Sequence, residues 1–362
     1  MRRLLALLLL LLGLPLSALA APETPYAADT VLQTVTLSEG ARVVLDALYP
    51  GVLRCEETIP LPDKTSYDDV NAAMRCLSRS YPELFHLKNE WTISYFQSAP
   101  EYATSVIPIY GMAAPEYEAR LAAMLDMARE LAHGVTGTQT EQAEALHDLL
   151  CERTLYDKSE TEPLSDNTAY GALVDGVTRC EGYAQALTLL YRLAGIPCGM
   201  VTGDTFEDEE VVRHAWNVAV MDGTPALIDA TWNDQDGGNT HWYYGVTTDM
   251  MALDHFPDAE YALPECASLA VNWHARRGLL VNDGTELLTA LRSFAQSDEV
   301  SIRFMDAELF HDFVARTNDW LADYNAVCPP GEAFYGMYSV IFPETQQCVM
   351  LRRVGEKETP EG

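Results

Sequence analysis

The stretch that decides the fold runs GVTRCEGYAQA, from Gly176 to Ala186. Beyond it, apolar residues recur at three- and four-residue spacing as far as Ala194, which predicts a helix buried along one face. Gly195 and Pro197 predict its end, because glycine adopts the left-handed cap conformation and proline cannot continue a helix. Cys180 is therefore placed at, or within one turn of, a helix N-terminus.

A cysteine in that position has a chemical reason to be reactive. The unpaired N–H groups and the positive end of the helix dipole favour a thiolate, and the thiolate is the nucleophilic form of cysteine. Cys180 is therefore a candidate nucleophile. The competing interpretation is a buried helix cysteine, which is the commoner role of a single cysteine. The neighbouring motifs favour the catalytic interpretation.

Two later segments supply a base and a carboxylate. His214 to Val220 reads as a strand, and Ala226 to Trp232 reads as the strand that returns after a turn. With an even number of loop residues, His214 and Asp229 fall on one face, directly opposite or one diagonal step apart. An odd loop or a bulge would separate them. Cys180, His214 and Asp229 then form a triad in which His214 is the base and Asp229 fixes its tautomer.

These residues together resemble the transglutaminase-like superfamily, in a secreted bacterial form. The resemblance covers roughly residues 135 to 256 and is carried by the order Cys, His, Asp within four segments: Cys180 to Ala184, Gly195 to Pro197, His214 to Asn217 and Asp229 to Trp232. It implies a papain-like core in which the catalytic helix packs on an antiparallel sheet. The superfamily includes transglutaminases, peptidases, peptide N-glycanases, deamidases and members that have lost catalysis.

One residue of the motif departs from the pattern. Many relatives carry a small or apolar residue before the nucleophile, and this chain carries Arg179. Its charge either favours the thiolate further or biases the choice of substrate, or it is simply solvated. The other histidines are weaker candidates: His241 and His255 are rival bases, but no strand with a matched carboxylate follows them, and we assign His147 and Cys151 to packing or to the surface.

The first 20 residues read as a secretory signal peptide. Two arginines follow Met1, an apolar run extends from Leu4 to Leu14, and a small-residue cleavage site occupies Ala18 to Ala20. We therefore expect a secreted protein. No other stretch of the sequence approaches the roughly 20 apolar residues that span a bilayer, so we expect no stable membrane insertion after cleavage.

The charge of the chain narrows the range of partners. The formal net charge is −31 at pH 7, which should repel nucleic acid and anionic lipid. The expected partner is a protein or peptide substrate, with cell-wall and surface proteins among the candidates. No clustered cysteine and histidine spacing of the zinc-site type is present, so we expect neither a metal nor another cofactor.

The eight cysteines leave the disulfide connectivity open. Secretion permits disulfides, and the pairs closest in sequence are Cys55 with Cys76 and Cys328 with Cys348. A free Cys180 leaves an odd number of remaining cysteines, so at least one more is expected to be unpaired.

The predicted fold class is α+β, in four parts. These are the signal peptide (1–20), an N-terminal α+β domain (21–130), the transglutaminase-like catalytic core (131–262) and a small C-terminal α/β module (263–362). Capping residues predict helix starts at Ser66 and at Thr138. In the C-terminal module we expect strands at 273–281 and 300–304, helices at 285–295 and 307–324, and a hairpin from 335–342 and 348–354.

The expected chemistry is acyl transfer through a thioester on Cys180, resolved either by water or by an amine. The backbone N–H of Cys180 is the natural oxyanion donor, and no second donor is identifiable. The rival from another class is a non-catalytic extracellular module that binds a protein or the cell wall through the same cleft. The three triad residues argue against this rival, because binding alone does not require all three.

Overall fold

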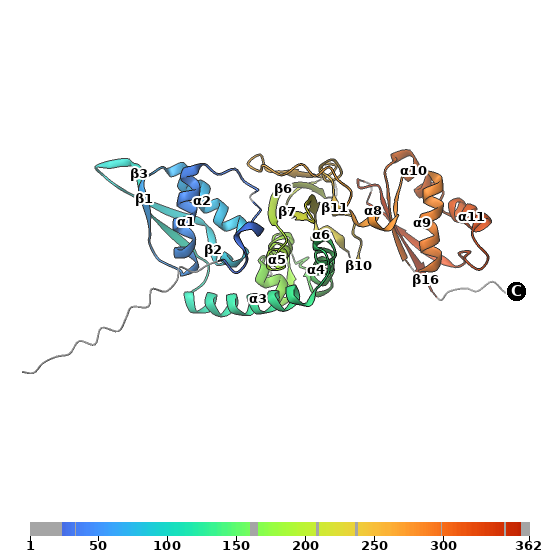
Figure 1. Cartoon of the computed structure of the whole chain (residues 1–362), viewed down its shortest axis with the longest axis horizontal. Helices are drawn as coiled ribbons and strands as arrows, with labels where there is room; N and C mark the ends of the chain where they lie inside the picture. Colours follow the sequence, from blue (N-terminus) through green and yellow to red (C-terminus); the bar gives the residue numbers. More distant parts are fainter. Residues whose placement is uncertain are drawn as a thin grey trace, which may run out of the picture.

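The computed structural model describes residues 24–32, 34–159, 166–207, 210–235, 238–297, 299–343 and 345–355. The predicted signal peptide lies outside the described residues. Figure 1 shows three regions in a row along the longest axis, the N-terminal one in blue, the central one in green and yellow, and the C-terminal one in orange and red. The protein mixes helices with antiparallel sheets, as the sequence predicted.

The N-terminal region packs two helices on a three-stranded antiparallel sheet. Its elements are η1 (Ala28–Thr30), α1 (Glu39–Leu53), β1 (Ile59–Thr65), α2 (Tyr67–Ser80), η2 (Pro82–Leu84), β2 (Leu87–Phe96) and β3 (Ala99–Tyr110), with strand order β1-β3-β2. The Oγ atom of Ser66 accepts a hydrogen bond from the N–H of Asp69, which confirms the predicted start of α2. Val44, Leu48, Val70 and Met74 form part of the core between the helices and the sheet.

The central region encloses one helix, α5, between a sheet and two other helices. Its sheet has the order β11-β8-β7-β6-β12 and every neighbouring pair is antiparallel. The helices are α3 (Ala114–Gly134), α4 (Gln139–Arg153), η3 (Gly171–Asp175), α5 (Cys180–Leu193), α6 (Ala230–Asn233) and α7 (Thr248–Met251). The strands are β4 (Leu155–Tyr156), β5 (Val177–Thr178), β6 (Cys198–Glu207), β7 (Glu210–Met221), β8 (Thr224–Ile228), β9 (Asp234–Gln235), β10 (Gly238–Asn239), β11 (Tyr244–Val246) and β12 (His255–Pro257).

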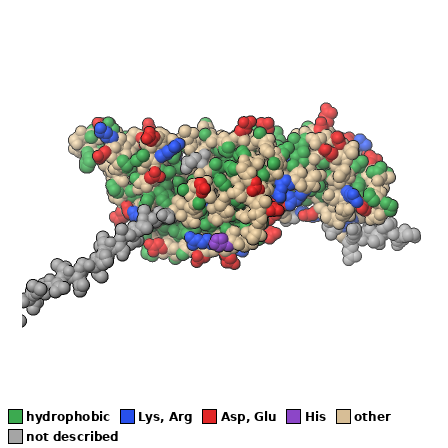
Figure 2. All heavy atoms as spheres, viewed as in Figure 1, with side chains coloured by type: hydrophobic (Ala, Val, Ile, Leu, Met, Phe, Trp, Pro, Cys, Tyr) green, Lys and Arg blue, Asp and Glu red, His purple; other side chains and the backbone are tan. Residues whose placement is uncertain are grey.

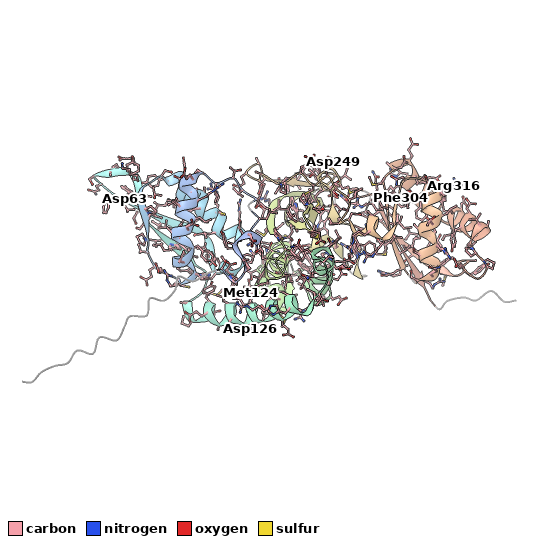
Figure 3. The ribbon with its side chains drawn as sticks, in the orientation of Figure 1. Asp63, Met124, Asp126, Asp249, Phe304 and Arg316 are labelled. Carbon is pink, nitrogen blue, oxygen red and sulfur yellow. The ribbon has the colours of Figure 1, made fainter. Side chains whose placement is uncertain are left out.

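Helix α5 is more deeply enclosed than its periodicity suggested. Every residue from Gly182 to Arg192 is buried, because β6 and β7 cover one side while α3 and α4 cover the other. The helix ends where predicted, with Gly195 in the left-handed region at φ +78°. The predicted capping box of α4 is also present, since Thr138 and Glu141 each bond the other's backbone N–H. In Figure 3, Met124 and Asp126 lie on α3; Met124 is buried and Asp126 is exposed.

The C-terminal region is a four-stranded sheet with helices packed on it. Its elements are α8 (Trp273–Arg277), β13 (Leu280–Val281), α9 (Gly284–Gln296), β14 (Glu299–Phe304), α10 (Ala307–Ala315), α11 (Thr317–Val327), β15 (Met337–Ile341) and β16 (Cys348–Val354). The strand order is β13-β14-β16-β15, and β15 and β16 form the predicted terminal hairpin.

Two predictions in this region were wrong. The strand expected at 273–281 is helix α8 followed by the short β13, because the Asn272 side chain caps the first turn and Gly278 closes it at φ +67°. The single helix expected at 307–324 is interrupted at Arg316, whose backbone at φ −131° is not helical. Arg316 and Phe304 are labelled in Figure 3.

The cysteine pairs suggested by sequence distance are not formed, since all eight cysteines are free thiols. Cys76 is buried in α2, where its sulfur faces Ser80, whereas Cys55 lies half-buried in a turn. Cys348 is enclosed in the core of β16, whereas Cys328 ends α11. In each suggested pair, therefore, one cysteine is buried and the other is only half-buried.

A buried polar cluster joins the N-terminal region to the core. Glu83 is fully buried and accepts hydrogen bonds from the hydroxyls of Tyr26 and Tyr49. Arg192, on α5, donates to the same Tyr26 hydroxyl at 2.9 Å and to the carbonyl of Ser80 at 2.6 Å. Burial raises the pKa of Glu83, although the Arg192 charge and the tyrosine hydroxyls oppose this. No motif in the sequence marks this junction.

Two surface properties follow from the structure. Acidic side chains are spread over all three regions on the face shown in Figure 2, with basic ones between them. Among the residues that the structure describes, no helix combines the length and the apolar character needed to cross a membrane.

Candidate active site

The chain enters helix α5 through a tightly packed turn that leaves Cys180 as its first residue. Arg179, in extended conformation, precedes the helix, and Cys180 is half-buried. The side chain of Asn167 accepts a hydrogen bond from the N–H of Gly182 at 3.1 Å. A Cβ atom at Gly182 would lie 1.9 Å from Oγ1 of Thr178. Glycine at this position therefore allows the loop to pack against the first turn of the helix.

His214 lies on β7, and Asp229 lies just beyond the end of β8. The hairpin loop contains two residues, and the strands pair Asn217 with Ile228. His214 and Asp229 are therefore one diagonal step apart on the same face, which is one of the two predicted arrangements. The predicted strand through Trp232 was too long: β8 ends at Ile228, because Asp229 caps α6 by accepting a hydrogen bond from the Trp232 N–H.

The structure brings the three predicted residues together. Nε2 of His214 lies 2.7 Å from Oδ2 of Asp229, and both side chains are buried. The side chain of Cys180 lies near the His214 ring and helps to raise its pKa, and both residues line the same cleft. Since Asp229 occupies Nε2, Nδ1 is the ring nitrogen available to the thiol. Cys180, His214 and Asp229 thus stand in the order that a triad requires.

The charges of His214 and Asp229 stabilise each other. Burial by itself would lower the pKa of His214, but the charge and hydrogen bond of Asp229, together with Cys180, raise it to about 10. Burial would raise the pKa of Asp229, but the charges and hydrogen bonds of His214 and His255 lower it well below its usual value. At neutral pH the site therefore favours an imidazolium beside an ionised carboxylate.

The cysteine and histidine open onto a cleft with a volume of about 520 Å³. One wall comes from the N-terminal region and the other from the core. The lining residues on the N-terminal side are Ser78, Arg79, Leu84, Phe85, Leu87 and Asn89, and those on the core side include Asn167, Thr168, Cys180, Glu181, Gln185, Thr202, Arg213 and His214. No catalytic motif in the sequence marks the residues of the N-terminal wall.

His255 has a place in the site that differs from the one considered from sequence. It is not a rival base but lies behind the carboxylate, with Nε2 at 3.1 Å from Oδ2 of Asp229. The rings of Trp216, Trp232 and Tyr243 surround it with centroid distances of 4.8 to 5.2 Å. The sequence signal that could have revealed this role is the acidic neighbour, Asp254.

Arg179, the residue that departs from the family pattern, is held away from the nucleophile by acidic and backbone groups. Its Nε lies 3.7 Å from Oδ2 of Asp157, and its guanidinium donates to the carbonyl of Ser159. Arg179 therefore anchors the segment before α5.

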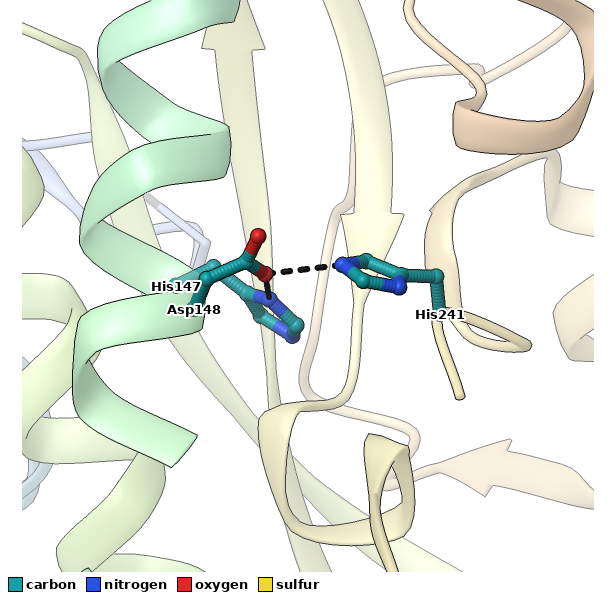
Figure 4. Close-up of side chains that lie close together, drawn as sticks. All are labelled: His147, Asp148 and His241. Atoms are coloured by element: carbon teal, nitrogen blue, oxygen red, sulfur yellow. Dashed lines mark hydrogen bonds and ion pairs between the residues drawn. The ribbon is translucent and has the colours of Figure 1, made fainter. Parts of the chain in front are cut away.

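A second cluster of histidine and aspartate lies near α4. Figure 4 shows Asp148 between His147 and His241, with its Oδ1 atom 2.9 Å from Nδ1 of His147 and 2.8 Å from Nε2 of His241. His147 is fully buried, in line with the packing role expected for it. The composition of the cluster resembles that of a metal site.

The hydrogen bonds around this cluster assign it a structural role instead. Oδ1 of Asn233 accepts from the N–H of Tyr243, so its amide nitrogen faces and donates to Nε2 of His147. Nδ1 of His147 must then carry the proton and donate to Asp148. Tetrahedral zinc ligands at 2.0–2.1 Å from the metal stand roughly 3.3 Å apart, farther than the histidine nitrogens stand from Asp148 here.

The same geometric test applies to His214, Asp229 and His255, the other group with metal-ligating atoms. His214 and Asp229 approach to 2.7 Å, a hydrogen-bond distance that is too short for two ligands of one tetrahedral ion. The residues present therefore fit a hydrogen-bonded relay better than a metal centre.

Comparison with known proteins places the core among established relatives. Residues 126–242 match the transglutaminase-like superfamily. Human kyphoscoliosis peptidase is 27% identical over 143 residues, which cover 33% of this chain and 21% of that protein. Its mouse counterpart is 30% identical over 100 residues, which cover 22% of this chain and 15% of that protein. The chain thus spans about a fifth of the human relative and less of the mouse one.

A solved structure described as a TGase is 11% identical and has a TM-score of 0.28, with coverage of 48% of this chain and 50% of that one. A similarity at that TM-score adds nothing to the assignment, which depends on the sequence match over the core. The matched segment contains α4 and α5 and all three residues of the predicted triad. The chain therefore carries a core of the transglutaminase-like superfamily at residues 126–242.

Proposed function

We propose that this protein is a cysteine-dependent acyl transferase or hydrolase acting on peptide or carboxamide bonds. The single observation that supports this most is the geometry of His214. One ring nitrogen is held 2.7 Å from the buried Asp229, while the ring and Cys180 line the same open cleft. A nucleophile, a base and an orienting carboxylate are the parts that thioester chemistry needs.

The proposed reaction proceeds in two steps. The thiolate sulfur of Cys180 attacks the carbonyl carbon, and the carbonyl π electrons move to the oxygen. The backbone N–H of Cys180, at the start of α5, donates to that oxyanion. When the oxyanion collapses, the C–N bond breaks, the imidazolium of His214 gives its proton to the departing amine, and a thioester remains on Cys180.

The second step releases the acyl group. Neutral His214 accepts a proton from water or from an amine, which attacks the thioester carbonyl, and the C–S bond breaks to regenerate the thiolate. Attack by water gives hydrolysis or deamidation, whereas attack by an amine gives a new amide. Asp229 keeps the ring oriented throughout, because its Oδ2 holds Nε2 while Nδ1 faces the sulfur.

The alternative function is recognition without catalysis, in which the cleft binds an extracellular protein or cell-wall segment. Leu84, Phe85 and Leu87 line the N-terminal wall and would suit an apolar side chain of such a partner. The low pKa of the buried Asp229 favours catalysis, because a binding cleft gains nothing from an ionised carboxylate held out of solvent behind its wall.

Secretion and the nature of the substrate are part of the same proposal. The net charge of −31 and the signal-like first 20 residues support an extracellular protein that acts on proteins or peptides. The matched human and mouse proteins carry the name peptidase, which agrees with hydrolysis as one outcome.

Trapping the acyl-enzyme with hydroxylamine tests the function without a known substrate. The protein is incubated with a casein digest and hydroxylamine, and hydroxamates are mapped by mass spectrometry. Hydroxamates at new C-termini indicate a peptidase, and those on glutamine side chains indicate deamidation or amine transfer.

The controls are Cys180→Ala, which should abolish the signal, and Cys55→Ala, which alters another half-buried cysteine and should not. Saturable binding of peptides without any hydroxamate above the Cys180→Ala background would favour the binding module instead.

A further inference from the structure

His255 is held between two carboxylates. Its Nε2 lies 3.1 Å from Oδ2 of Asp229, and its Nδ1 lies 2.6 Å from Oδ1 of Asp254. An ionised carboxylate only accepts hydrogen bonds, so both ring nitrogens must donate. The ring that satisfies both contacts is an imidazolium, and it is buried, with 1% of its surface exposed. The proposed catalytic carboxylate thus has a cation on each side.

Asp254 is held in turn by one side chain of the central region and by two of the C-terminal region. The hydroxyl of Tyr243 donates to its Oδ2 at 2.9 Å. The hydroxyl of Thr345 donates to the same oxygen at 2.7 Å, and the amide of Gln346 donates to both carboxylate oxygens at 3.0 Å. Thr345 and Gln346 lie between β15 and β16, in the C-terminal region, about ninety residues from Asp254 in sequence.

The orientation of the Gln346 amide is fixed by a cation. Arg303, on β14, donates to Oε1 of Gln346 at 3.0 Å, and a guanidinium has no acceptor. The amide nitrogen of Gln346 must therefore point toward Asp254. Both Arg303 and Gln346 are buried, so solvent does not compete for these bonds. A continuous series of hydrogen bonds therefore links Arg303 to Asp229: Arg303 donates to Gln346, Gln346 and His255 both donate to Asp254, and His255 also donates to Asp229.

We propose that the C-terminal region completes the active site: Thr345 and Gln346 hold Asp254, Asp254 keeps His255 as an imidazolium, and His255 keeps Asp229 ionised and aimed at His214. This inference rests on the proposed function of the triad. It assigns His255, Asp254 and Gln346 as positioning residues, since none of them lines the cleft.

The charge arrangement explains why the relay matters. Asp229 is completely buried, and a buried carboxylate without enough partners takes up a proton. A neutral Asp229 would stabilise the imidazolium of His214 less, and the thiolate of Cys180 would lose its cation. The ionisable groups that face His255 are Asp229, Asp254, His214 and Tyr243, with Arg303 and Cys348 beyond Asp254.

The test is the rate at which iodoacetamide alkylates Cys180 as a function of pH, with the site mapped by mass spectrometry. Gln346→Leu fills the same space but donates nothing to Asp254. We expect the midpoint of its pH–rate profile to move upward by about one unit, so that alkylation is slower by up to about tenfold at pH values below the midpoint. His255→Gln, which keeps a donor but loses the charge, should show a larger shift in the same direction.

The matched control is Asn325→Ala. Asn325 also makes two side-chain hydrogen bonds in the C-terminal region, both to the backbone of Phe334. Its loss should lower thermal stability while the pH profile stays that of the wild type. If Gln346→Leu does not fold, Thr345→Val replaces it, because the Thr345 side chain is exposed and its loss removes a single hydrogen bond.

The outcomes separate the two claims. Wild-type Cys180 that reacts no faster at about pH 6 than Cys55 contradicts the proposed function itself. Wild-type Cys180 that reacts fast, together with an unchanged midpoint in folded Gln346→Leu or Thr345→Val, overturns only the role of the C-terminal region. A shifted midpoint in these variants, absent from Asn325→Ala, supports it.

Discussion

Nε2 of His214 and Oδ2 of Asp229 lie 2.7 Å apart, and neither side chain has more than a few per cent of its surface in solvent. The same oxygen of Asp229 also contacts Nε2 of His255, while its other oxygen caps helix α6 through the Trp232 N–H. Asp229 is therefore fixed from three directions, and His214 has one available orientation relative to it.

Asp229→Asn should reduce turnover on the order of 10²- to 10⁴-fold with little change in fold. The oxygen that caps Trp232 would keep its place, so the new amide nitrogen would face His214 and His255. An amide nitrogen donates hydrogen bonds and cannot accept them from the two rings. His214 would then be held in the wrong tautomer. The measurement is hydroxamate formation together with circular dichroism.

The control is Asp222→Asn, which also alters an aspartate that caps a helix, there at the start of α4. That variant should retain full turnover. Equal losses in both variants would show that the effect is general destabilisation.

His214 should stay protonated through neutral pH, since the pKa of this buried ring is raised to about 10. The unfolded chain has the ordinary value of roughly 6.5, so folding binds the proton more tightly. The resulting stabilisation is complete below about pH 6.5 and is lost as pH rises through 10. Imidazole nitrogen NMR of the folded protein should show this ring titrating far above the ordinary histidine value of roughly 6.5, and titration near neutrality would contradict the site's charge balance.

His86 should make the protein sensitive to acid. Burial lowers its pKa to about 4, although its bond to the Val52 carbonyl opposes this. Because the folded value lies below the unfolded one, stability is present above about pH 6.5 and is lost as pH falls toward 4, by up to about 3 kcal/mol. His86→Phe keeps a ring between Tyr110 and Tyr117 and should flatten this dependence.

Urea unfolding at several pH values measures the effect, with exposed His133→Gln as the control. The buried His274, whose pKa is also lowered by burial, should leave a residual slope in His86→Phe. A slope unchanged from the wild type would assign the acid sensitivity to His274 or to other groups.

Gly182→Ala should displace the loop before α5 and thereby disturb the position of Cys180. The added Cβ would lie 1.9 Å from Oγ1 of Thr178 and 2.8 Å from the carbonyl of Thr168, so the loop before α5 must move. We expect a loss of stability of about 1–3 kcal/mol and slower alkylation of Cys180. Gly134→Ala, at the end of α3 with open space around its Cβ, should be neutral. Wild-type alkylation in Gly182→Ala would show that the loop adapts.

A chelator should leave alkylation of Cys180 unchanged. The histidine nitrogens and carboxylate oxygens in the two His-Asp-His groups lie 2.7 to 3.1 Å apart, as in hydrogen bonds. Dialysis against EDTA followed by alkylation at about pH 6 measures this. A loss of reactivity that zinc restores would contradict the hydrogen-bonded interpretation.

Much of the site could be predicted from the sequence because its signals are local. The helix of Cys180 is marked by periodicity and by Gly195, and the hairpin that carries His214 needs only a two-residue loop to set its register. The order Cys, His, Asp, which resembles that of the transglutaminase-like superfamily, supplied the grouping of the three residues into one site. The placement of Asp229 on the same face as His214 was predicted although the strand assigned to Asp229 was too long, since that placement depends on the diagonal step and not on where β8 ends.

The supporting residues could not be predicted because their contacts connect distant parts of the chain. Gln346 meets Asp254 across 92 residues, and Glu83 joins a tyrosine 57 residues away. Neither contact leaves a periodic pattern. The prediction of a strand at 273–281 was wrong for another reason. The Asn272 cap and the left-handed Gly278 begin and end a short helix there, and they outweigh the β-forming residues that follow.

The most direct test of the account is iodoacetamide alkylation of the wild type, Cys180→Ala and His214→Ala between about pH 5 and pH 9, with every cysteine mapped. If Cys180 and His214 form a thiolate–imidazolium pair, Cys180 is alkylated selectively among the eight cysteines at about pH 6, and His214→Ala abolishes this selectivity. A Cys180 that reacts slowly at about pH 6, or at the same rate with and without His214, would contradict the thiolate–imidazolium pair and with it the proposed enzyme.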